Sequence, residues 1–242
     1  MAEKKVLGIL GGLGPAASVY FYDLITRHTL ASRDRDHLDV IVVSAASTPD
    51  RTAYITGKSK DSPLGPMKKA AGTLYRAGAE IIAVPCNTAQ YFFDELQKSS
   101  PVPIMNIVRE TAANAKRLGA KRVGVLATDG TIISGSYKSE CERLGMEYAV
   151  PDEDGQRRLM DIIYKSIKTA SPPDIGAFDA ISDELFARGC DFVILGCTEL
   201  SLLPKDKLKN ADKFIDSLLV LTCRAITECG GVPTGFDEKY II

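Results

Sequence analysis

The sequence predicts an α/β fold of two pseudo-symmetric lobes, each a mostly parallel sheet flanked by helices, with a ligand site in the cleft between them. Three observations carry this prediction. Short β-branched apolar runs alternate with longer amphipathic segments along the 242 residues. The expected strands are apolar nearly throughout, as parallel strands covered on both faces are. A stretch of the first half of the chain also reappears in the second half.

In the first half, four apolar runs each precede an amphipathic segment. The expected strands are KVLGIL, LDVIVVS, EIIAVP and VPIMNI, at residues 5–10, 38–44, 80–85 and 102–107. The expected helices cover residues 15–32, 66–77, 88–97 and 109–118. This βαβα order indicates a parallel sheet, because a parallel pair of strands needs a crossover connection, usually a helix.

The same rhythm continues in the second half. The expected strands are RVGVLA, a short MEYAV and DFVILG, at residues 122–127, 146–150 and 191–196. The expected helices cover residues 131–144, 155–169 and 175–187.

An internal repeat relates the two halves. RAGAEIIAVPCNTA (76–89) aligns without gaps with ARGCDFVILGCTEL (187–200), so that Cys86 matches Cys197. The strand openings KKVLGIL and KRVGVLA also resemble each other. Because no low-complexity linker divides the chain, we interpret the repeat as a duplicated α/β unit whose two copies face each other.

The composition is that of a soluble globular protein with a small-molecule ligand. The 30 basic and 31 acidic residues give a formal net charge of −1, without a basic stripe, which argues against nucleic acid as a partner. The apolar run after the first lysines is too short for a signal peptide or a membrane span, so we expect no membrane association. Six cysteines without CxxC spacing indicate a reduced, cytoplasmic protein. Only two histidines are present, which disfavours a zinc site and serine–histidine hydrolysis.

Two cysteines are expected at the ligand-binding edges of the sheets. Cys86 follows EIIAVP and Cys197 follows DFVILG, and ligands bind outside the carboxyl ends of parallel strands. If the lobes face each other, the two thiols approach a ligand from opposite sides. Racemisation requires this arrangement, because one group removes an α-proton and another returns a proton to the opposite face. A thiol pKa of ~8.5, lowered by a neighbouring helix N-terminus, would let thiolate and thiol coexist.

Free cysteine is most often a small buried hydrophobic residue. This interpretation suffices for the other four: Cys141, Cys190, Cys223 and Cys229. For Cys86 and Cys197 a functional role is favoured, because both follow strands at matching places in the repeat. No lysine lies in a recognisable pyridoxal-binding context, so we expect no cofactor and a carbanion stabilised electrostatically. The expected donors are Asn87, Thr88, Thr128 and Thr198.

Candidate anchors for a carboxylate lie near the same edges. STPDRTAYITGK (47–58) follows the second strand, and its Arg51 could pair with a carboxylate in bidentate fashion. Lys165 or Lys168 could reach in from the second half, although a solvated surface charge is the simpler interpretation of each. The glycine-rich stretch 11–15 fits a dinucleotide fingerprint only loosely. It fits better as a loop that admits the backbone of a small zwitterion.

These residues together resemble the aspartate/glutamate racemase family. The segments GILGGLGP, PDRTAYI, PCNTA, LATDGTI and GCTE follow the family's order across nearly the whole chain. The resemblance is to aspartate racemases more than to glutamate racemase. It implies two pseudo-symmetric lobes, a catalytic cysteine from each, no cofactor, and commonly a homodimer.

The resemblance also assigns site residues and domain limits. It implies that Arg51, and Lys168 rather than Lys165, contact the substrate carboxylates, and that Leu13 of the glycine motif lines the site. It further implies that the chain from about residue 215 returns to the first lobe. The expected domains are therefore 1–105 plus about 215–242, and 106–214.

Two residues depart from the family pattern. Leu13 stands where methionine is usual, which is a mild apolar exchange. Gln90 stands where histidine often follows PCNTA, which removes a titratable group near Cys86 and bears on pH optimum and substrate. Since both cysteines are present, a one-sided variant such as a decarboxylase is disfavoured.

The sequence therefore predicts proton transfer at the α-carbon of L- or D-aspartate. Glutamate or broad-specificity racemisation, hydantoin racemisation, and cis–trans isomerisation by a cysteine nucleophile stay open as alternatives on the same scaffold. A two-lobed module that binds an acidic amino acid without turning it over is a more distant alternative, because binding alone needs no paired thiols.

Overall fold

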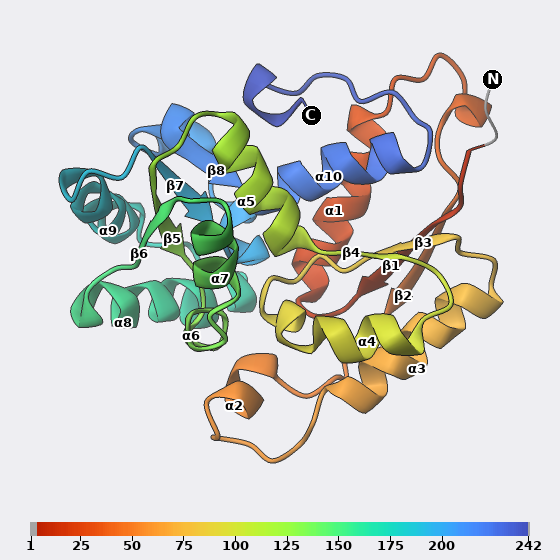
Figure 1. Ribbon diagram of the computed structural model, residues 1–242, viewed down its shortest axis with the longest axis horizontal. Helices are drawn as coiled ribbons and strands as arrows, with labels where there is room; N and C mark the ends of the chain where they lie inside the picture. The colour runs from red at the N-terminus through yellow and green to blue at the C-terminus, as the bar shows by residue number, and fades with distance from the viewer. Residues whose placement is uncertain (1–3, 242) are drawn as a thin grey trace.

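A computed structural model describes residues 4–241 of the protein. It contains two four-stranded parallel sheets, which form the two lobes seen on either side of Figure 1. The strand order is β2-β1-β3-β4 in the first sheet and β6-β5-β7-β8 in the second. The two lobes thus share one topology, and the predicted fold class is confirmed.

The first sheet and its helices occupy the N-terminal half. The strands are β1 (Leu7–Gly11), β2 (Val40–Ser44), β3 (Ile81–Ala83) and β4 (Ile104–Met105). The helices are α1 (Pro15–His28), α2 (Arg51–Ile55), α3 (Leu64–Arg76), α4 (Phe93–Ser99) and α5 (Ile107–Arg117), with short 3-10 turns η1 (Asp34–Asp36) and η2 (Thr88–Phe92).

The second sheet and its helices follow. The strands are β5 (Arg122–Leu126), β6 (Glu147–Ala149), β7 (Phe192–Leu195) and β8 (Phe214–Asp216). The helices are α6 (Asp129–Ile133), α7 (Ser136–Arg143), α8 (Glu153–Asp161), α9 (Ile175–Ala187) and α10 (Ser217–Glu228). Shorter turns are η3 (Ile162–Ser166), η4 (Ile167–Thr169), η5 (Thr198–Leu202), η6 (Lys205–Lys207), η7 (Ala211–Lys213) and η8 (Glu238–Tyr240).

Three predicted helices differ from the structure in ways that concern the site. Gly135, with φ 67°, divides the helix expected over residues 131–144 into α6 and α7, because glycine adopts this left-handed conformation without strain. The helix expected over 155–169 ends as α8 and continues as a π-helical turn, η3, and a 3-10 turn, η4. The helix expected over 88–97 starts with the 3-10 turn η2.

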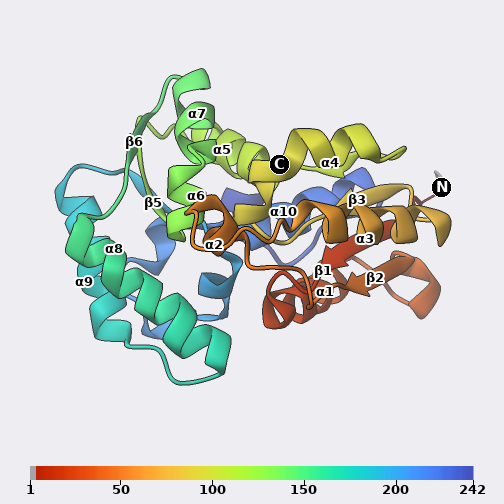
Figure 2. The same cartoon turned by 90° about the horizontal axis from the view of Figure 1, so that it is seen from below.

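Two long helices join the lobes. Asn106 caps α5, accepting hydrogen bonds from the N–H groups of Val108 and Arg109, both at 3.1 Å. Helix α5 follows the last strand of the first sheet but packs against α7 and α10, and α10 follows β8 but packs against α1. Figures 1 and 2 both show α5 and α10 between the sheets. A single buried apolar cluster therefore contains residues from both sheets and both helices.

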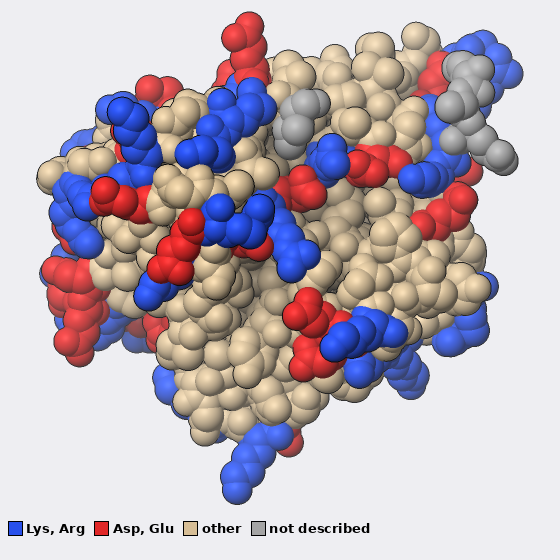
Figure 3. All heavy atoms as spheres, viewed as in Figure 1, with Lys and Arg blue, Asp and Glu red and all other residues tan. Residues whose placement is uncertain are grey.

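The outer surface is mixed in charge. On the face drawn in Figure 3, acidic and basic side chains are interspersed. Within residues 4–241, no helix combines the length and the apolar character that a bilayer crossing requires.

Candidate active site

A cavity lies at the carboxyl ends of the strands, between the lobes, and thirteen residues line it. Nine are the predicted site residues: Leu13, Arg51, Cys86, Asn87, Thr88, Thr128, Lys168, Cys197 and Thr198. The other four are Asp50, Thr52, Tyr164 and Glu199. All the predicted site residues are therefore brought together around one space, although their chemical roles stay predictions.

The two cysteines enter the cavity from equivalent positions. Cys86 follows β3 and Cys197 follows β7, and only 6% and 5% of their surfaces are exposed. The motifs also touch, since the Thr198 hydroxyl donates to the Pro85 carbonyl at 3.1 Å. Each cysteine thus belongs to a different lobe but faces the same space.

The side chain of Asn87 holds the lobes together beside Cys86. Its Nδ2 donates to Ser217 Oγ at 3.0 Å, and the Tyr137 hydroxyl donates to its Oδ1 at 2.7 Å. Ser217 Oγ in turn donates to the carbonyl of Leu195 at 2.7 Å. This chain of bonds runs from the end of β7 to the first cysteine motif and fixes the approach of Cys86.

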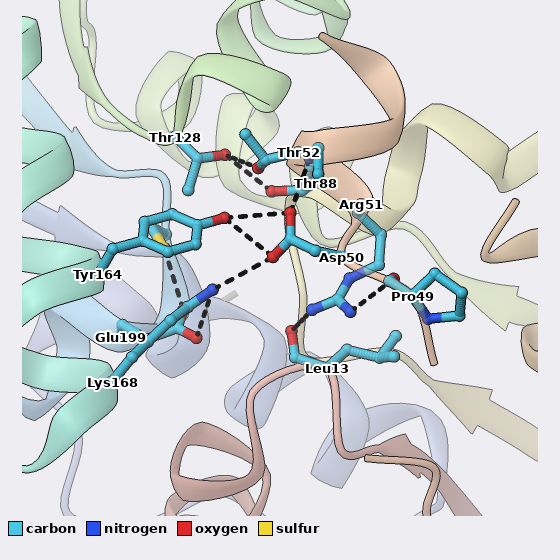
Figure 4. A network of polar contacts seen from close by, with 12 residues as sticks. Leu13, Pro49, Asp50, Arg51, Thr52, Thr88, Thr128, Tyr164, Lys168 and Glu199 are labelled. Carbon is cyan, nitrogen blue, oxygen red and sulfur yellow. Dashed lines mark hydrogen bonds and ion pairs between the residues drawn. The ribbon is translucent and has the colours of Figure 1, made fainter. Parts of the chain in front are cut away.

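Four threonine hydroxyls form a buried cluster at one wall. Thr88 Oγ1 lies 2.9 Å from both Thr128 Oγ1 and Thr131 Oγ1, and Thr52 Oγ1 donates to Thr128 Oγ1 at 3.2 Å. Thr52 and Thr88 belong to the first lobe, whereas Thr128 and Thr131 begin α6 in the second (Figure 4 labels three of them). Gly130 allows this contact, because an added Cβ would lie 2.8 Å from the Thr52 Cα.

Arg51 is buried and held by backbone carbonyls. Its guanidinium donates to the carbonyls of Pro49 at 3.0 Å and Leu13 at 2.6 Å, with a longer bond to Thr48 at 3.3 Å. Its Nε has no hydrogen-bond partner among the described residues. Three carbonyls thus orient one permanent positive charge at the cavity, and Figure 4 shows two of them, those of Pro49 and Leu13.

Lys168 faces Arg51 across the cavity, within a group of polar side chains. Its Nζ lies 3.9 Å from Asp50 Oδ2, 3.9 Å from Glu199 Oε1 and 3.9 Å from the centre of the Tyr164 ring. Burial lowers the pKa of the ammonium, but the two carboxylates, Cys197 and Tyr164 together outweigh burial and raise it. Lys165 instead pairs with Asp161 on the surface, whereas Lys168 lines the cavity.

Asp50 connects the first lobe to the π-helical turn of the second. Its Oδ1 caps α2 by accepting from the N–H of Ala53 at 2.7 Å, and the Tyr164 hydroxyl donates to its Oδ2 at 3.1 Å. Figure 4 shows Tyr164 and Lys168 converging on this carboxylate. Single π-turns often occur at functional sites, and η3 places Tyr164 toward the cavity just before Lys168.

The environment of Cys197 corrects one expectation. The sequence predicts that a helix N-terminus lowers the pKa of each thiol, but burial, followed by the charge of Glu199, raises the pKa of Cys197 well above its ordinary value. The Cys197 thiol donates to Glu199 Oε2 at 3.0 Å. The helix that follows is only the five-residue turn η5, so its dipole is small.

Sequence reasoning missed four lining residues, of which three had a visible signal. Asp50 and Thr52 flank Arg51 in the PDRTAYI segment, and Glu199 ends the GCTE segment. The fourth, Tyr164, carries no pattern that separates it from surface residues. Gln90 lies behind Cys86, with its Nε2 donating weakly to the Cys86 carbonyl at 3.5 Å, and is not a lining residue.

Comparisons with known proteins identify sequence relatives of this chain. A family model described as Asp/Glu/Hydantoin racemase matches residues 10–224. The broad specificity amino-acid racemase RacX of Bacillus subtilis (strain 168) is 29% identical over 223 residues, 88% of this chain and 92% of that protein. Glutamate racemase of Persephonella marina is 30% identical over 157 residues, 63% of this chain and 58% of that protein.

A solved structure extends the similarity to nearly the whole chain. Picrophilus torridus aspartate racemase superposes with a TM-score of 0.85 at 26% identity, covering 98% of this chain and all of that one. The match of the family model covers well over half of the 242 residues. The chain therefore belongs to the Asp/Glu/hydantoin racemase family.

Proposed function

We propose that the protein is a cofactor-independent amino-acid racemase that interconverts L- and D-aspartate. One observation carries the proposal: two cysteines at equivalent strand ends of two like lobes line a single cavity. Such a pair can exchange protons with both faces of one α-carbon, which racemisation requires. Two thiols therefore place one proton-transfer group on each face of the α-carbon.

The cavity supplies charge on opposite sides for a dicarboxylic substrate. Arg51, fixed by three carbonyls, is the anchor of the first lobe, and Lys168 is the anchor of the second. An incoming carboxylate at Lys168 would compete with Asp50 and Glu199. Two fixed anchors would hold the α-carbon between the thiols, which lowers the entropic part of the barrier.

The proton transfers balance without any other reagent. The thiolate of one cysteine takes the α-proton, and the electron pair of the broken C–H bond stays on the α-carbon and its carboxylate. The thiol of the other cysteine then donates its proton to the opposite face, leaving a thiolate. We propose that Thr88, Thr128 and the backbone N–H groups around Thr198 stabilise the negative charge that develops, since the Thr198 hydroxyl itself donates to the Pro85 carbonyl.

Aspartate is the proposed substrate because of the two anchors and the close fold similarity to an aspartate racemase. Broad amino-acid specificity is the second candidate, since RacX matches 88% of the chain.

We also propose a cytoplasmic homodimer that binds only small molecules, with domains 1–105 plus about 215–242 and 106–214. Analytical ultracentrifugation would contradict the dimer by showing a monomer at micromolar concentration.

Incubation of the reduced protein with L-aspartate in D2O, without pyridoxal phosphate, tests the function. We expect circular dichroism of the substrate to decay to zero while NMR shows deuterium entering the α-position. L-Glutamate, L-alanine and hydantoins run in parallel define the substrate class. Tight binding of aspartate without decay or exchange would contradict the proposal and favour the binding module.

A further inference from the structure

The carboxylate of Glu199 is buried against one of the two thiols. Cys197 Sγ donates to Glu199 Oε2 at 3.0 Å, and Glu199 is only 5% exposed. Its Oε1 has no hydrogen-bond partner among residues 4–241, and Lys168 Nζ stays 3.9 Å away. A buried carboxylate with an unpartnered oxygen costs free energy. This cost indicates a role beyond packing.

Gly14 of the other lobe makes room for this carboxylate. A Cβ added at Gly14 would overlap Glu199 Oε1. Gly14 is the N-cap of the 14-residue helix α1 and provides no side-chain cap. The free N–H groups of the first turn favour a negative charge nearby. The glycine motif, expected to admit a substrate backbone, thus also admits the Glu199 side chain.

The pseudo-symmetric position in the first lobe has no acid. In the repeat, Cys86 matches Cys197 and Thr88 matches Glu199. Thr88 is part of the threonine cluster, with bonds of 2.9 Å to Thr128 and Thr131. A hydroxyl of this kind cannot take up a proton near neutral pH. The two thiols therefore differ in what receives their proton.

We propose that Glu199 is the proton acceptor and positioning residue of Cys197. When Cys197 has to act as the base, its S–H bond breaks, an O–H bond forms at Glu199 Oε2, and the electron pair stays on sulfur as the thiolate. The thiolate then removes the α-proton, and Cys86 donates its own proton to the other face. Solvent exchange afterwards carries the proton of Glu199 back to Cys86. This inference rests on the proposed function.

Other charged and titratable groups face the same pair. Lys168 from η4 lies next to Glu199, Tyr164 from η3 and Asp50 from the start of α2 contact Lys168, and Cys86 lies across the cavity. The Lys168 ammonium lowers the pKa of Cys197, while burial and Glu199 raise it. The net effect is a raised pKa of the Cys197 thiol, so Cys197 keeps its proton before a substrate binds.

The isosteric variant Glu199→Gln separates this role from simple packing. Iodoacetamide alkylates the thiolate form of cysteine, and peptide mass spectrometry measures the alkylation rate of Cys86 and Cys197 separately, without substrate. The pH at which each rate reaches half of its maximum is the midpoint of that thiol. In the variant, we expect the midpoint for Cys197 to move down by about one pH unit or more, because the neighbouring negative charge is gone. We also expect kcat to fall about 100-fold although more thiolate is present, because the proton acceptor is lost.

Asp50→Asn is the matched control. It removes the other carboxylate beside Lys168, which does not contact the thiol, so the midpoint for Cys197 should stay in place. An unchanged midpoint in Glu199→Gln would overturn the proposal. A kcat that rises together with the thiolate would also overturn it, because Glu199 would then only suppress the base.

Gly14→Ala provides a second test from the opposite lobe. The backbone of Gly14 is extended, with φ −123°, so alanine is tolerated there and its methyl group displaces Glu199. We expect the same direction of change as in Glu199→Gln, and no further change in the double variant. Additive effects would contradict the coupling. Because alkylation needs no turnover, an inactive wild-type protein would contradict the proposed function and leave this test readable.

Discussion

The two lobes place site residues on equivalent connections. The loops after β1 and β5 carry Leu13 and Thr128, and the loops after β3 and β7 carry Cys86 and Cys197. The connections after the edge strands β2 and β6 carry the charged anchors, Arg51 and Lys168. The shared topology therefore fixes where functional side chains enter the cavity, while the residue types at those positions differ between lobes.

The difference between the lobes is largest beside the cysteines. Cys86 adjoins a neutral cluster of hydroxyl groups, whereas Cys197 adjoins a buried carboxylate. The anchors differ too, since Arg51 is fixed by carbonyls and Lys168 by carboxylates and an aromatic ring. A duplicated scaffold thus gives symmetric positions, and local side chains make the two halves chemically unequal.

Removing either thiol should have the largest effect. In Cys86→Ala and in Cys197→Ala, racemisation should fall by about 10³-fold or more, because each direction needs both a base and an acid. Circular dichroism and α-proton exchange in D2O measure this loss. Each variant should retain exchange with a different enantiomer, since a different thiol remains.

Cys190→Ala is the control for the cysteine variants. Cys190 is buried in the apolar core before β7, at the far end of the strand from the cavity. Its variant should racemise normally. Full activity in either cavity variant would contradict the two-thiol mechanism.

Exchanging the cation at either anchor should reduce activity less than removing a cysteine, and the two anchors should lose different amounts. Arg51→Lys keeps the charge but loses the planar fork that three carbonyls hold. The transition-state stabilisation calculated from kcat/KM should therefore fall by about 2–4 kcal/mol. Lys168→Arg keeps a cation in a site that holds its charge through carboxylates, so the loss should be about tenfold or less. Steady-state kinetics for both enantiomers would measure the two losses. Equal losses would show that the anchors are chemically equivalent.

The sequence predicts positions along strands better than contacts across the cleft. Cys86 and Cys197 could be found because following an apolar strand is a local property. Tyr164 could not, because its place at the cavity depends on the π-turn η3 and on a contact with Asp50 of the other lobe. The close approach of Gly130 to Thr52 is likewise a contact across the cleft that no local pattern predicts.

The threonine cluster should also contribute to the stability of the fold. Thr128→Val removes the N-cap of α6 and leaves the hydroxyls of Thr52 and Thr88 with fewer partners. We expect a loss of about 1–2 kcal/mol in the free energy of unfolding, read by urea denaturation. Thr128→Ser keeps the hydroxyl and should lose less than half of that. Equal losses would show that the methyl group, not the hydroxyl, matters.

The smallest expected effect concerns the ends of the sheets that lie away from the cavity. Asp191 and Glu80 occupy matching positions in the repeat there but accept different numbers of hydrogen bonds. Asp191 accepts from the N–H groups of Lys121 and Arg122 at 2.8 and 2.9 Å, and these two bonds, Arg122 first, lower its pKa. Glu80, its partner in the repeat, accepts one such bond within residues 4–241, from the N–H of Val6 at 2.9 Å.

A lowered folded-state pKa means that the stabilisation by Asp191 is complete above the unfolded pKa of ~3.9 and is lost as pH falls through the folded value. Asp191 is mostly exposed, so solvent screening limits the effect of Asp191→Asn to about 0.5–1 kcal/mol near pH 7. Urea unfolding at pH 7 should show this loss and a smaller one for Glu80→Gln. Below about pH 3 the Asp191→Asn difference should shrink, because the wild-type carboxyl is then increasingly protonated. If the difference in unfolding free energy between wild type and Asp191→Asn persists unchanged at low pH, its cause is the shape of the asparagine side chain and not the charge of Asp191.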